Sequence, residues 1–263
     1  MGLASPFPSL VCAQPPQLSP EQQVWVAERI FANECAGEFQ CLTSWNNGEN
    51  FPSMGLGHFI WYPSGYDDIY VESFPALLDY FVTQGTEIPT WLEELPTNDA
   101  PWASREDFYR DFEGPRLASL RRFLAENMAI QAAFIIERQE GALLSMTAGL
   151  ETNKKAAIEA LYHELAVTQM PYGIFALIDY INFKGEGSSP LERYQGEGWG
   201  LLQVLERMLT TDVDSDTDLL EQFIQAAAFV LNRRVANSPP ARNEQQWLPG
   251  WSNRIHSYKP RPD

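Results

Sequence analysis

Glu34 stands at a position where a side chain could perform acid–base chemistry. Residues 19–37 carry the signals of one helix: a serine N-cap, a proline at the first helical position and a closing glycine. On a helical wheel with about 100° per residue, Glu34 lies on the face of Ile30 and Phe31. Burial on that face, and then the negative end of the helix dipole, would raise the pKa of its carboxyl, as a general acid requires. The alternative is a structural glutamate that points to solvent or pairs with an arginine such as Arg254.

A polar, glycine-rich stretch follows this helix and ends in Ser53-Met-Gly-Leu-Gly-His58. The segment resembles the (Thr or Ser)-x-Gly-x-Gly-His signature of phage-type lysozymes. In that family a glutamate at the end of the first long helix precedes a short hairpin and this signature, and residues 25–62 have the same order. The resemblance implies a lysozyme-like fold with Glu34 as the acid. It also implies that Ser53 positions the attacking water or binds the intermediate, and that His58 is a structural partner of the hairpin.

The sequence departs from this family at the second carboxylate. The family has an acidic residue six positions before the threonine, where this chain has Asn47, and an amide does not ionise. Glu49 is the only carboxylate between residues 42 and 66, so it is the predicted substitute if two carboxylates flank the sugar bond. The alternatives are that Glu49 is a solvent-facing turn residue, and that the protein uses one carboxylate, as lytic transglycosylases do, or only binds glycan.

A second resemblance lies downstream, where Gly-Glu-Gly-Trp-Gly-Leu-Leu-Gln-Val, residues 196–204, is similar to a glycine-rich stretch of goose-type lysozymes and lytic transglycosylases. It follows Glu34 by more than 160 residues, whereas those families have a few dozen. Glycines that let a helix begin close to its neighbour explain the pattern equally well.

Aromatic side chains such as Trp45 offer flat faces for pyranose rings, although aromatic residues are common in a core. The predicted substrate-binding residues are Trp45, Asn47, His58, Tyr194, Gln195 and Glu197.

Composition excludes several classes of protein. The 263 residues are 44% hydrophobic and 13% aromatic, which is typical of a folded globular protein. Eighteen Lys and Arg against 35 Asp and Glu give a net charge of −17, which repels nucleic-acid phosphates and anionic lipids. No apolar run reaches the roughly 20 residues that cross a bilayer. We therefore expect no nucleic-acid partner and no membrane insertion, and the spacing of the cysteines and histidines predicts no metal site or cofactor.

Helical periodicity, interrupted by Gly, Pro and Asp, predicts a mostly α (α+β) protein with one small irregular β-hairpin region near residues 42–66. Residues 1–18 are expected to form a flexible tail, and residues 19–263 a single lysozyme-like helical domain. The stretches at 86–101 and 185–190 are predicted loops. Helices beyond the first are predicted at residues 74–84, 104–112, 115–138, 140–149, 152–167, 171–183, 198–210, 217–236 and 251–258.

The cysteines leave two interpretations open. Cys35 and Cys41 stand six residues apart, so they either form a disulfide in an oxidising compartment or remain packed thiols, with Cys12 left over. The Pro- and Ser-rich start is either the remnant of a trimmed secreted protein or a flexible tail. We expect a periplasmic or extracellular location.

Together these patterns predict a monomeric glycoside hydrolase that cleaves β-1,4 linkages of an amino-sugar polymer, with peptidoglycan as the expected substrate. The charge of −17 opposes approach to an anionic cell wall, so a chitosanase-like hydrolase that acts on a cationic glycan is the alternative within the same class. The alternative from another class is a non-catalytic glycan-binding protein that kept the fold after losing the carboxylate at position 47.

Overall fold

A computed structural model describes residues 18–66, 70–190, 192–211 and 217–260. The described residues are mostly helical, which confirms the predicted fold class. The helices are α1 (Pro20–Cys35), α2 (Phe74–Thr83), α3 (Thr90–Glu93), α4 (Arg105–Arg110), α5 (Pro115–Glu126), α6 (Met128–Thr147), α7 (Thr152–Val167), α8 (Tyr172–Lys184), α9 (Leu201–Thr210), α10 (Leu219–Asn237) and α11 (Leu248–His256), with short 3₁₀ turns η1 (Phe39–Leu42), η2 (Pro240–Arg242) and η3 (Glu244–Trp247).

The first helix begins as its sequence signals predict. The hydroxyl of Ser19 accepts a hydrogen bond from the backbone of Gln22, and the Gln22 side chain accepts one from the backbone of Ser19, which completes a capping box. The helix ends at Cys35, because Ala36 adopts the left-handed conformation. The apolar face of α1 packs along α6, so Glu34 is brought to the end of a buried helix pair.

Two small sheets accompany the helices. Strands β1 (Thr43–Ser44), β2 (Ser53–Met54) and β3 (Phe59–Ile60) form an antiparallel sheet in chain order, which confirms the β region predicted near residues 42–66. The register pairs Ser53 with Ser44 on one side and with Ile60 on the other. A second antiparallel pair, β4 (Arg193–Tyr194) and β5 (Glu197–Gly198), was not predicted from the sequence.

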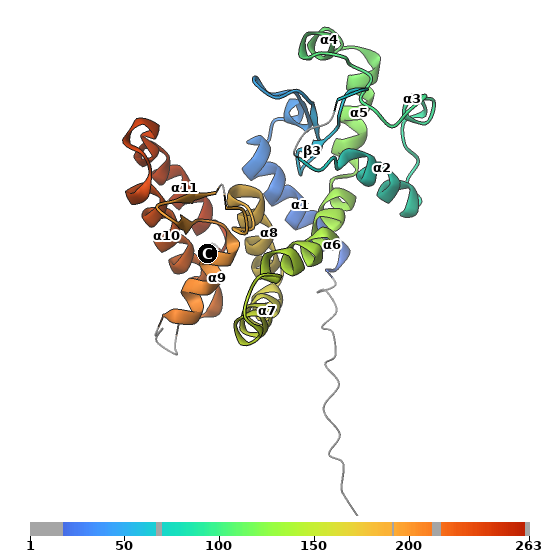
Figure 1. Ribbon diagram of the computed structural model, residues 1–263. Coiled ribbons are helices and arrows are strands. Elements are labelled where there is room, and N and C mark those ends of the chain that lie inside the picture. Colours follow the sequence, from blue (N-terminus) through green and yellow to red (C-terminus); the bar gives the residue numbers. More distant parts are fainter. Residues whose placement is uncertain (1–17, 67–69, 191, 212–216, 261–263) are drawn as a thin grey trace, which may run out of the picture.

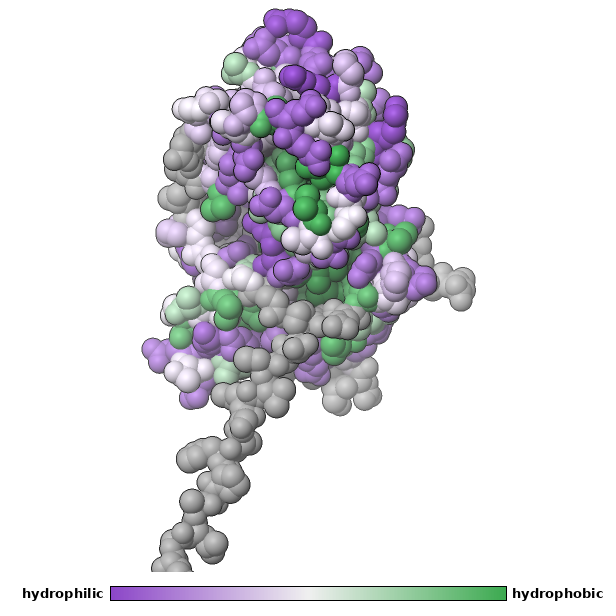
Figure 2. Space-filling model, turned by 90° about the vertical axis from the view of Figure 1, so that its right-hand side faces the viewer, coloured by the Kyte–Doolittle hydropathy of each residue, from purple (hydrophilic) through white to green (hydrophobic). Residues whose placement is uncertain are grey.

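The elements form two groups on either side of α1 (Figure 1). The three-stranded sheet and α2–α5 lie on one side, and α8–α11 lie on the other, with α6 running beneath the first group. Buried apolar side chains form one cluster that extends from Leu18 to Tyr258. The face that carries α2 and α6 is largely hydrophilic, with apolar side chains gathered toward its middle (Figure 2). Among the described residues, none of the helices has the length and hydropathy needed to cross a membrane.

Several predicted boundaries are wrong. The break predicted between the helices 115–138 and 140–149 is absent, because α6 continues through it, and the chain breaks instead at Asn127, between α5 and α6. The amide of Asn127 donates a hydrogen bond to the carbonyl oxygen of Phe123 at 2.8 Å, so this asparagine closes the preceding helix. The stretch predicted as a loop at 86–101 contains the short helix α3. Most of the predicted tail, residues 1–17, lies outside the described residues.

Candidate active site

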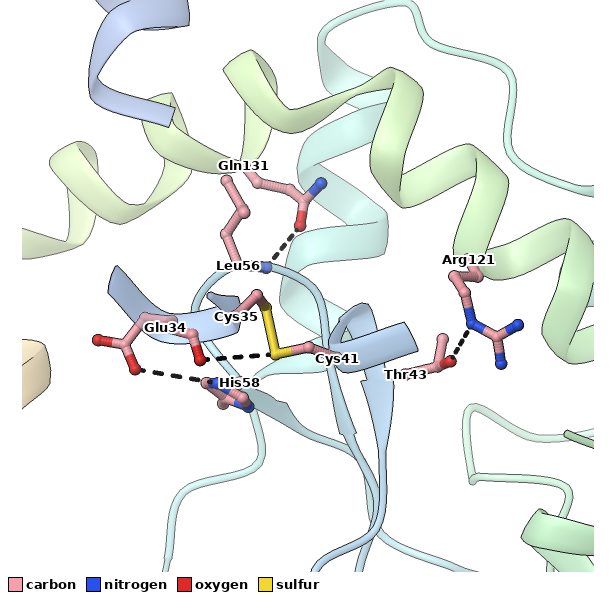
Figure 3. Close-up of a disulfide and its surroundings, with 8 residues drawn as sticks. All are labelled: Glu34, Cys35, Cys41, Thr43, Leu56, His58, Arg121 and Gln131. Atoms are coloured by element: carbon pink, nitrogen blue, oxygen red, sulfur yellow. Dashed lines mark hydrogen bonds and ion pairs between the residues drawn. A yellow bond between two sulfur atoms is a disulfide. The ribbon is translucent and has the colours of Figure 1, made fainter. Parts of the chain in front are cut away.

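The carboxylate of Glu34 lies in the last turn of α1 and faces two partners. Nη2 of Arg254, in α11, donates a hydrogen bond to Oε1. Nε2 of His58 lies 3.9 Å from Oε2, and Figure 3 shows both side chains beside the disulfide. The Glu34 side chain is 18% exposed, so it is half-buried rather than enclosed by apolar residues. The sequence left open whether Glu34 is a buried acid, points to solvent or pairs with Arg254, and the structure contains the pair with Arg254. The second carboxylate oxygen, Oε2, lies on the side of His58.

Asp179 compensates the charge of the arginine that holds Glu34. Its carboxylate is fully buried in α8 and accepts hydrogen bonds from Nε and Nη2 of Arg254, both at 2.8 Å. Further hydrogen bonds come from the hydroxyl of Tyr258 at 2.7 Å and from Nδ2 of Asn33 at 3.0 Å. Burial opposes the charge on Arg254, but Asp179 and Glu34 outweigh burial and raise the pKa of the guanidinium. Arg254 can therefore orient Glu34 without placing an uncompensated positive charge beside it.

The Gly-x-Gly-His turn brings His58 to the end of α1. Gly55 has φ +70°, and a Cβ at this position would lie 2.2 Å from Oε1 of Gln131, so only glycine fits without displacement. That same oxygen, on a buried side chain of α6, accepts a hydrogen bond from the backbone of Leu56 at 3.0 Å. The backbone of His58 donates to the carbonyl oxygen of Gly55 at 3.2 Å. These contacts hold the turn against α6 and fix the imidazole near Glu34.

The loop between β1 and β2 carries Glu49. Oε2 of this residue is buried and accepts no hydrogen bond from the described residues. Nε1 of Trp45 donates to the backbone oxygen of Glu49 at 2.8 Å, and the carbonyl of Trp45 accepts hydrogen bonds from Arg105 and Tyr109. A buried carboxylate oxygen without a donor costs free energy. It is therefore suited to accept a hydrogen bond from a water or hydroxyl group that enters the adjacent cavity.

The structure corrects the expectation that Trp45 stacks on a sugar. This residue is 3% exposed, and its ring packs edge-on against Phe108 at a centroid distance of 5.9 Å. The indole supports the Glu49 loop from inside and does not present a face to solvent. Asn47 is exposed at the tip of the loop and does not line the cavity beside Glu49. Its predicted contact with substrate therefore has no support from this geometry.

Two cavities meet at His58, and we call them together the cleft. The smaller, of about 390 Å³, is lined by Glu49, Ser53 and His58 among others. The larger, of about 720 Å³, shares His58, Ile60 and Tyr70 with it. Ser53 is in the central strand of the sheet and is 4% exposed, so strand pairing fixes its position in the cleft wall. The fold thus brings Glu49, Ser53 and His58 into one wall, with Glu34 next to His58.

The larger cavity extends from His58 toward α6 and the end of α8. Its charged lining residues are Glu137, Arg138 and Glu186, so carboxylates outnumber cations there. Asn182 adds an amide from α8. Sequence reasoning assigned none of these residues to the site, because helices α6 and α8 reach the cleft only through tertiary packing.

The structure contains a disulfide between Cys35 and Cys41, the first of the two interpretations drawn from their spacing. Sγ of Cys41 lies 3.6 Å from the backbone oxygen of Glu34. The bond joins the last residue of α1 to η1, directly behind the candidate acid (Figure 3). It therefore restrains the end of the helix that carries Glu34.

The downstream candidates lie away from the cleft. The hydroxyl of Tyr194 donates to Oε1 of Glu244 at 2.8 Å, and Glu197 pairs with Arg233 at 2.9 Å. Neither these two residues nor Gln195 lines either cavity. The expectation that Tyr194, Gln195 and Glu197 bind substrate in this cleft is therefore corrected: the glycine-rich hairpin secures α10 and the start of α9.

Sequence reasoning missed Asp179 and Lys184, although α8 carried a signal for both. The helix is apolar on nearly every face, so a charged residue within it must be buried. Lys184 is 8% exposed, and its Nζ lies 3.9 Å and 3.5 Å from the ring centroids of Phe183 and Trp251. Burial, followed by the charge of Arg234, lowers the pKa of Lys184 to about 7.

Comparison with protein-family models, curated proteins and solved structures finds no match to this chain.

Replacing Asp179 by Asn should destabilise the protein by about 3 to 5 kcal/mol, because Arg254 would keep a buried charge without its main partner. The exposed pair of Asp107 and Arg110 provides the control, and Asp107→Asn should cost no more than about 1 kcal/mol. Urea unfolding of both variants measures the difference. Equal urea midpoints for the two variants would show that Asp179 does not stabilise the buried charge of Arg254.

The stability of the protein should rise with pH through Lys184. Its folded pKa of about 7 lies below the ordinary value of 10.5, so between these values the unfolded chain binds a proton that the folded protein does not. The free energy of unfolding then rises by at most about 1.4 kcal/mol per pH unit in this window. Below the window both states bind the proton, so the full destabilisation by the buried charge of Lys184 is present there.

Lys184→Met should therefore be more stable than the parent at pH 7 and should lack this rise. Lys155→Met, which removes a lysine paired with Glu159 on the surface of α7, should retain it. Urea unfolding at about pH 7, 8 and 9 distinguishes the two, since this range lies inside the window. Parallel pH profiles for the parent and Lys184→Met would contradict the assignment.

Proposed function

We propose that this protein is a glycoside hydrolase that cleaves β-1,4 linkages of an amino-sugar polymer, with peptidoglycan as its substrate. One observation carries the proposal: His58 lines the smaller cavity together with the carboxylate residue Glu49, and its Nε2 lies 3.9 Å from the carboxylate of Glu34. Cleavage of a glycosidic bond commonly uses such a pair, one to protonate the leaving oxygen and the other to activate water or stabilise the transition state.

In the proposed mechanism, Glu34 protonates the leaving oxygen. Hydrogen bonding to Arg254 fixes Oε1, so Oε2 on the His58 side carries the proton. Glu49 activates the attacking water through its unpartnered Oε2, and the Ser53 hydroxyl in the same cavity helps to orient that water. The reaction needs no cofactor.

The acidic lining of the larger cavity favours a second candidate substrate. Glu137 and Glu186 line this cavity together with one cation, Arg138, and the whole chain carries −17. This field attracts a polymer of free amino sugars and repels an anionic cell wall. A chitosanase-like activity is therefore the second candidate, on the same catalytic residues.

We propose a periplasmic or extracellular site of action, where such polymers are found. The disulfide between Cys35 and Cys41 supports an oxidising compartment.

Turnover of peptidoglycan, chitosan and chitin, measured as released reducing ends, tests the function and ranks the substrates. Preferred cleavage of peptidoglycan supports the first proposal, and preferred cleavage of chitosan selects the second. Glycan binding without turnover of any of the three would replace both with a non-catalytic binding role.

Glu34→Gln should lower turnover by about a hundredfold or more, because the amide keeps the size and hydrogen bonding of the side chain but has no transferable proton. Glu28 lies on the same helix and is exposed, so Glu28→Gln is the matched control and should retain full activity. The rate on the best substrate of the panel gives the comparison. Substantial activity in Glu34→Gln would remove this residue from the mechanism.

Glu49→Gln should also reduce turnover by about a hundredfold, since it removes the carboxylate that activates water. Asn47→Ala, in the same loop, should change the rate little, because the Asn47 side chain does not line the cavity. Both variants are assayed at saturating substrate, with circular dichroism to confirm the fold. A dead Asn47→Ala together with an active Glu49→Gln would reverse the assignment.

A further inference from the structure

The disulfide beside Glu34 belongs to a larger group of metal-ligating atoms. One Sγ from each of Cys35 and Cys41 and one imidazole nitrogen of His58 all lie within 4.8 Å of one another. Three different segments supply them: the end of α1, η1 and the Gly-x-Gly-His turn. The group is not visible as a motif in the chain, because His58 joins the cysteines only through the packing of this turn.

The spacing of these atoms suits a zinc ion once the sulfur–sulfur bond is broken. With Zn–S of about 2.3 Å and Zn–N of about 2.0 Å, ligand atoms in a tetrahedral site lie about 3.3 to 3.8 Å apart. The Cα atoms of Cys35 and Cys41 are 5.4 Å apart, and packing of η1 against α1 and α5 keeps them close without the bond. Oε2 of Glu34 lies 3.9 Å from Nε2 of His58 but does not belong to this group, so a water molecule is the candidate for the fourth ligand.

We propose that reduction of the Cys35–Cys41 disulfide converts this group into a zinc site, in which the two thiolates and His58 bind Zn²⁺ and a water molecule completes the coordination. Zinc at this position withdraws His58 from the cleft and from its contact with Glu34, and it stops turnover. This inhibitory consequence rests on the glycosidase function proposed above, whereas binding of the metal does not.

The chemistry balances with a dithiol as the reductant. The dithiol transfers two electrons and two protons to the protein disulfide, so one S–S bond breaks, two S–H bonds form, and the dithiol becomes a cyclic disulfide. Zinc then replaces both thiol protons, which pass to solvent, and binds the neutral imidazole of His58. Cys41 and His58 are both partly exposed, so the reductant and the metal can reach the group.

The test uses the full chain in a Cys12→Ser background, which leaves the two cysteines of the site as its only thiols. The protein is reduced with a dithiol, freed of reductant without air, and titrated with Zn²⁺ against a chromophoric chelator. We expect one zinc per chain and an affinity at least about a hundredfold tighter than that of the oxidised protein. Co²⁺ in place of Zn²⁺ should give the absorption bands of a tetrahedral thiolate complex.

Three variants locate the site. Cys41→Ser and His58→Gln should each weaken zinc binding by about tenfold or more, whereas His163→Gln, on α7 and outside the group, should bind as the parent does. Circular dichroism of the reduced protein and of Cys35→Ser/Cys41→Ser establishes that the fold survives without the bond. Equal zinc affinity of the reduced and oxidised forms, unchanged binding in both ligand variants, or a reduced chain that unfolds and is not restored by zinc would each overturn the proposal.

Activity is measured separately from binding. The oxidised, metal-free protein tests the glycosidase function, and its inactivity on every glycan would refute that function without touching zinc binding. If the oxidised protein is active, the reduced zinc form should have lost at least about nine-tenths of its turnover, and a chelator followed by reoxidation should restore it. Full turnover by the zinc form would overturn the inhibitory part.

Discussion

The buried carboxylate of Asp179 is the constraint on which the candidate site depends. A charge inside a protein is tolerated only when hydrogen bonds and an opposite charge replace the water it has lost. Four donors from three side chains satisfy it: Arg254 twice, Tyr258 and Asn33. Because Asn33 belongs to α1 and Arg254 to α11, this one group ties the first and last helices to α8. The same arginine then holds Glu34, so the position of the candidate acid follows from how Asp179 is satisfied.

Several positively charged side chains are largely buried in this protein, although its net charge is strongly negative. Arg234 forms hydrogen bonds of 2.7 and 2.9 Å with buried Glu244 and lies 4.1 Å from the ring of Trp199. Lys184 lies against the rings of Phe183 and Trp251, and the charges of Arg234 and Arg254 act on it. Aromatic faces attract cations, so Arg234 and Arg254 can share the contact between α8, α10 and α11, whereas burial and these two arginines lower the pKa of Lys184. The surface is left richer in carboxylates, which shapes the field that a substrate meets.

Two chemistries compete for the same side chains at the end of α1. With the disulfide formed, His58 lines the cleft beside Glu34, and Glu49 reaches the same cavity from the loop between β1 and β2. With the disulfide reduced, we propose that the sulfur atoms become ligands and draw the imidazole away from Glu34 toward a metal. Both arrangements use a single turn whose glycine, Gly55, allows close contact with α6. The redox state of one cysteine pair would thus decide which chemistry the site performs.

The sequence by itself determined the local features of this protein. The cap of α1, the β region near residues 42–66 and most helices follow from short-range signals such as capping residues and apolar periodicity. Glu34, Glu49, Ser53 and His58 were all identifiable as candidates, since their polar types stand out in a glycine-rich stretch. Boundaries such as that at Asn127 were missed, because a side-chain hydrogen bond and packing, not a glycine, end the helix there.

Only the tertiary structure decided which candidates meet and with whom. Asp179 and Arg254 contact each other across 75 residues of chain, and no short-range pattern encodes that pairing. Trp45 read as a sugar-binding surface residue but is buried, because a local pattern does not reveal which face of an aromatic ring a later helix will cover. Tyr194 and Glu197 resembled site residues but bond to α10 and η3 instead. Long-range packing and the pairing of buried charges therefore determine which of the candidate residues in the sequence lie together in the site.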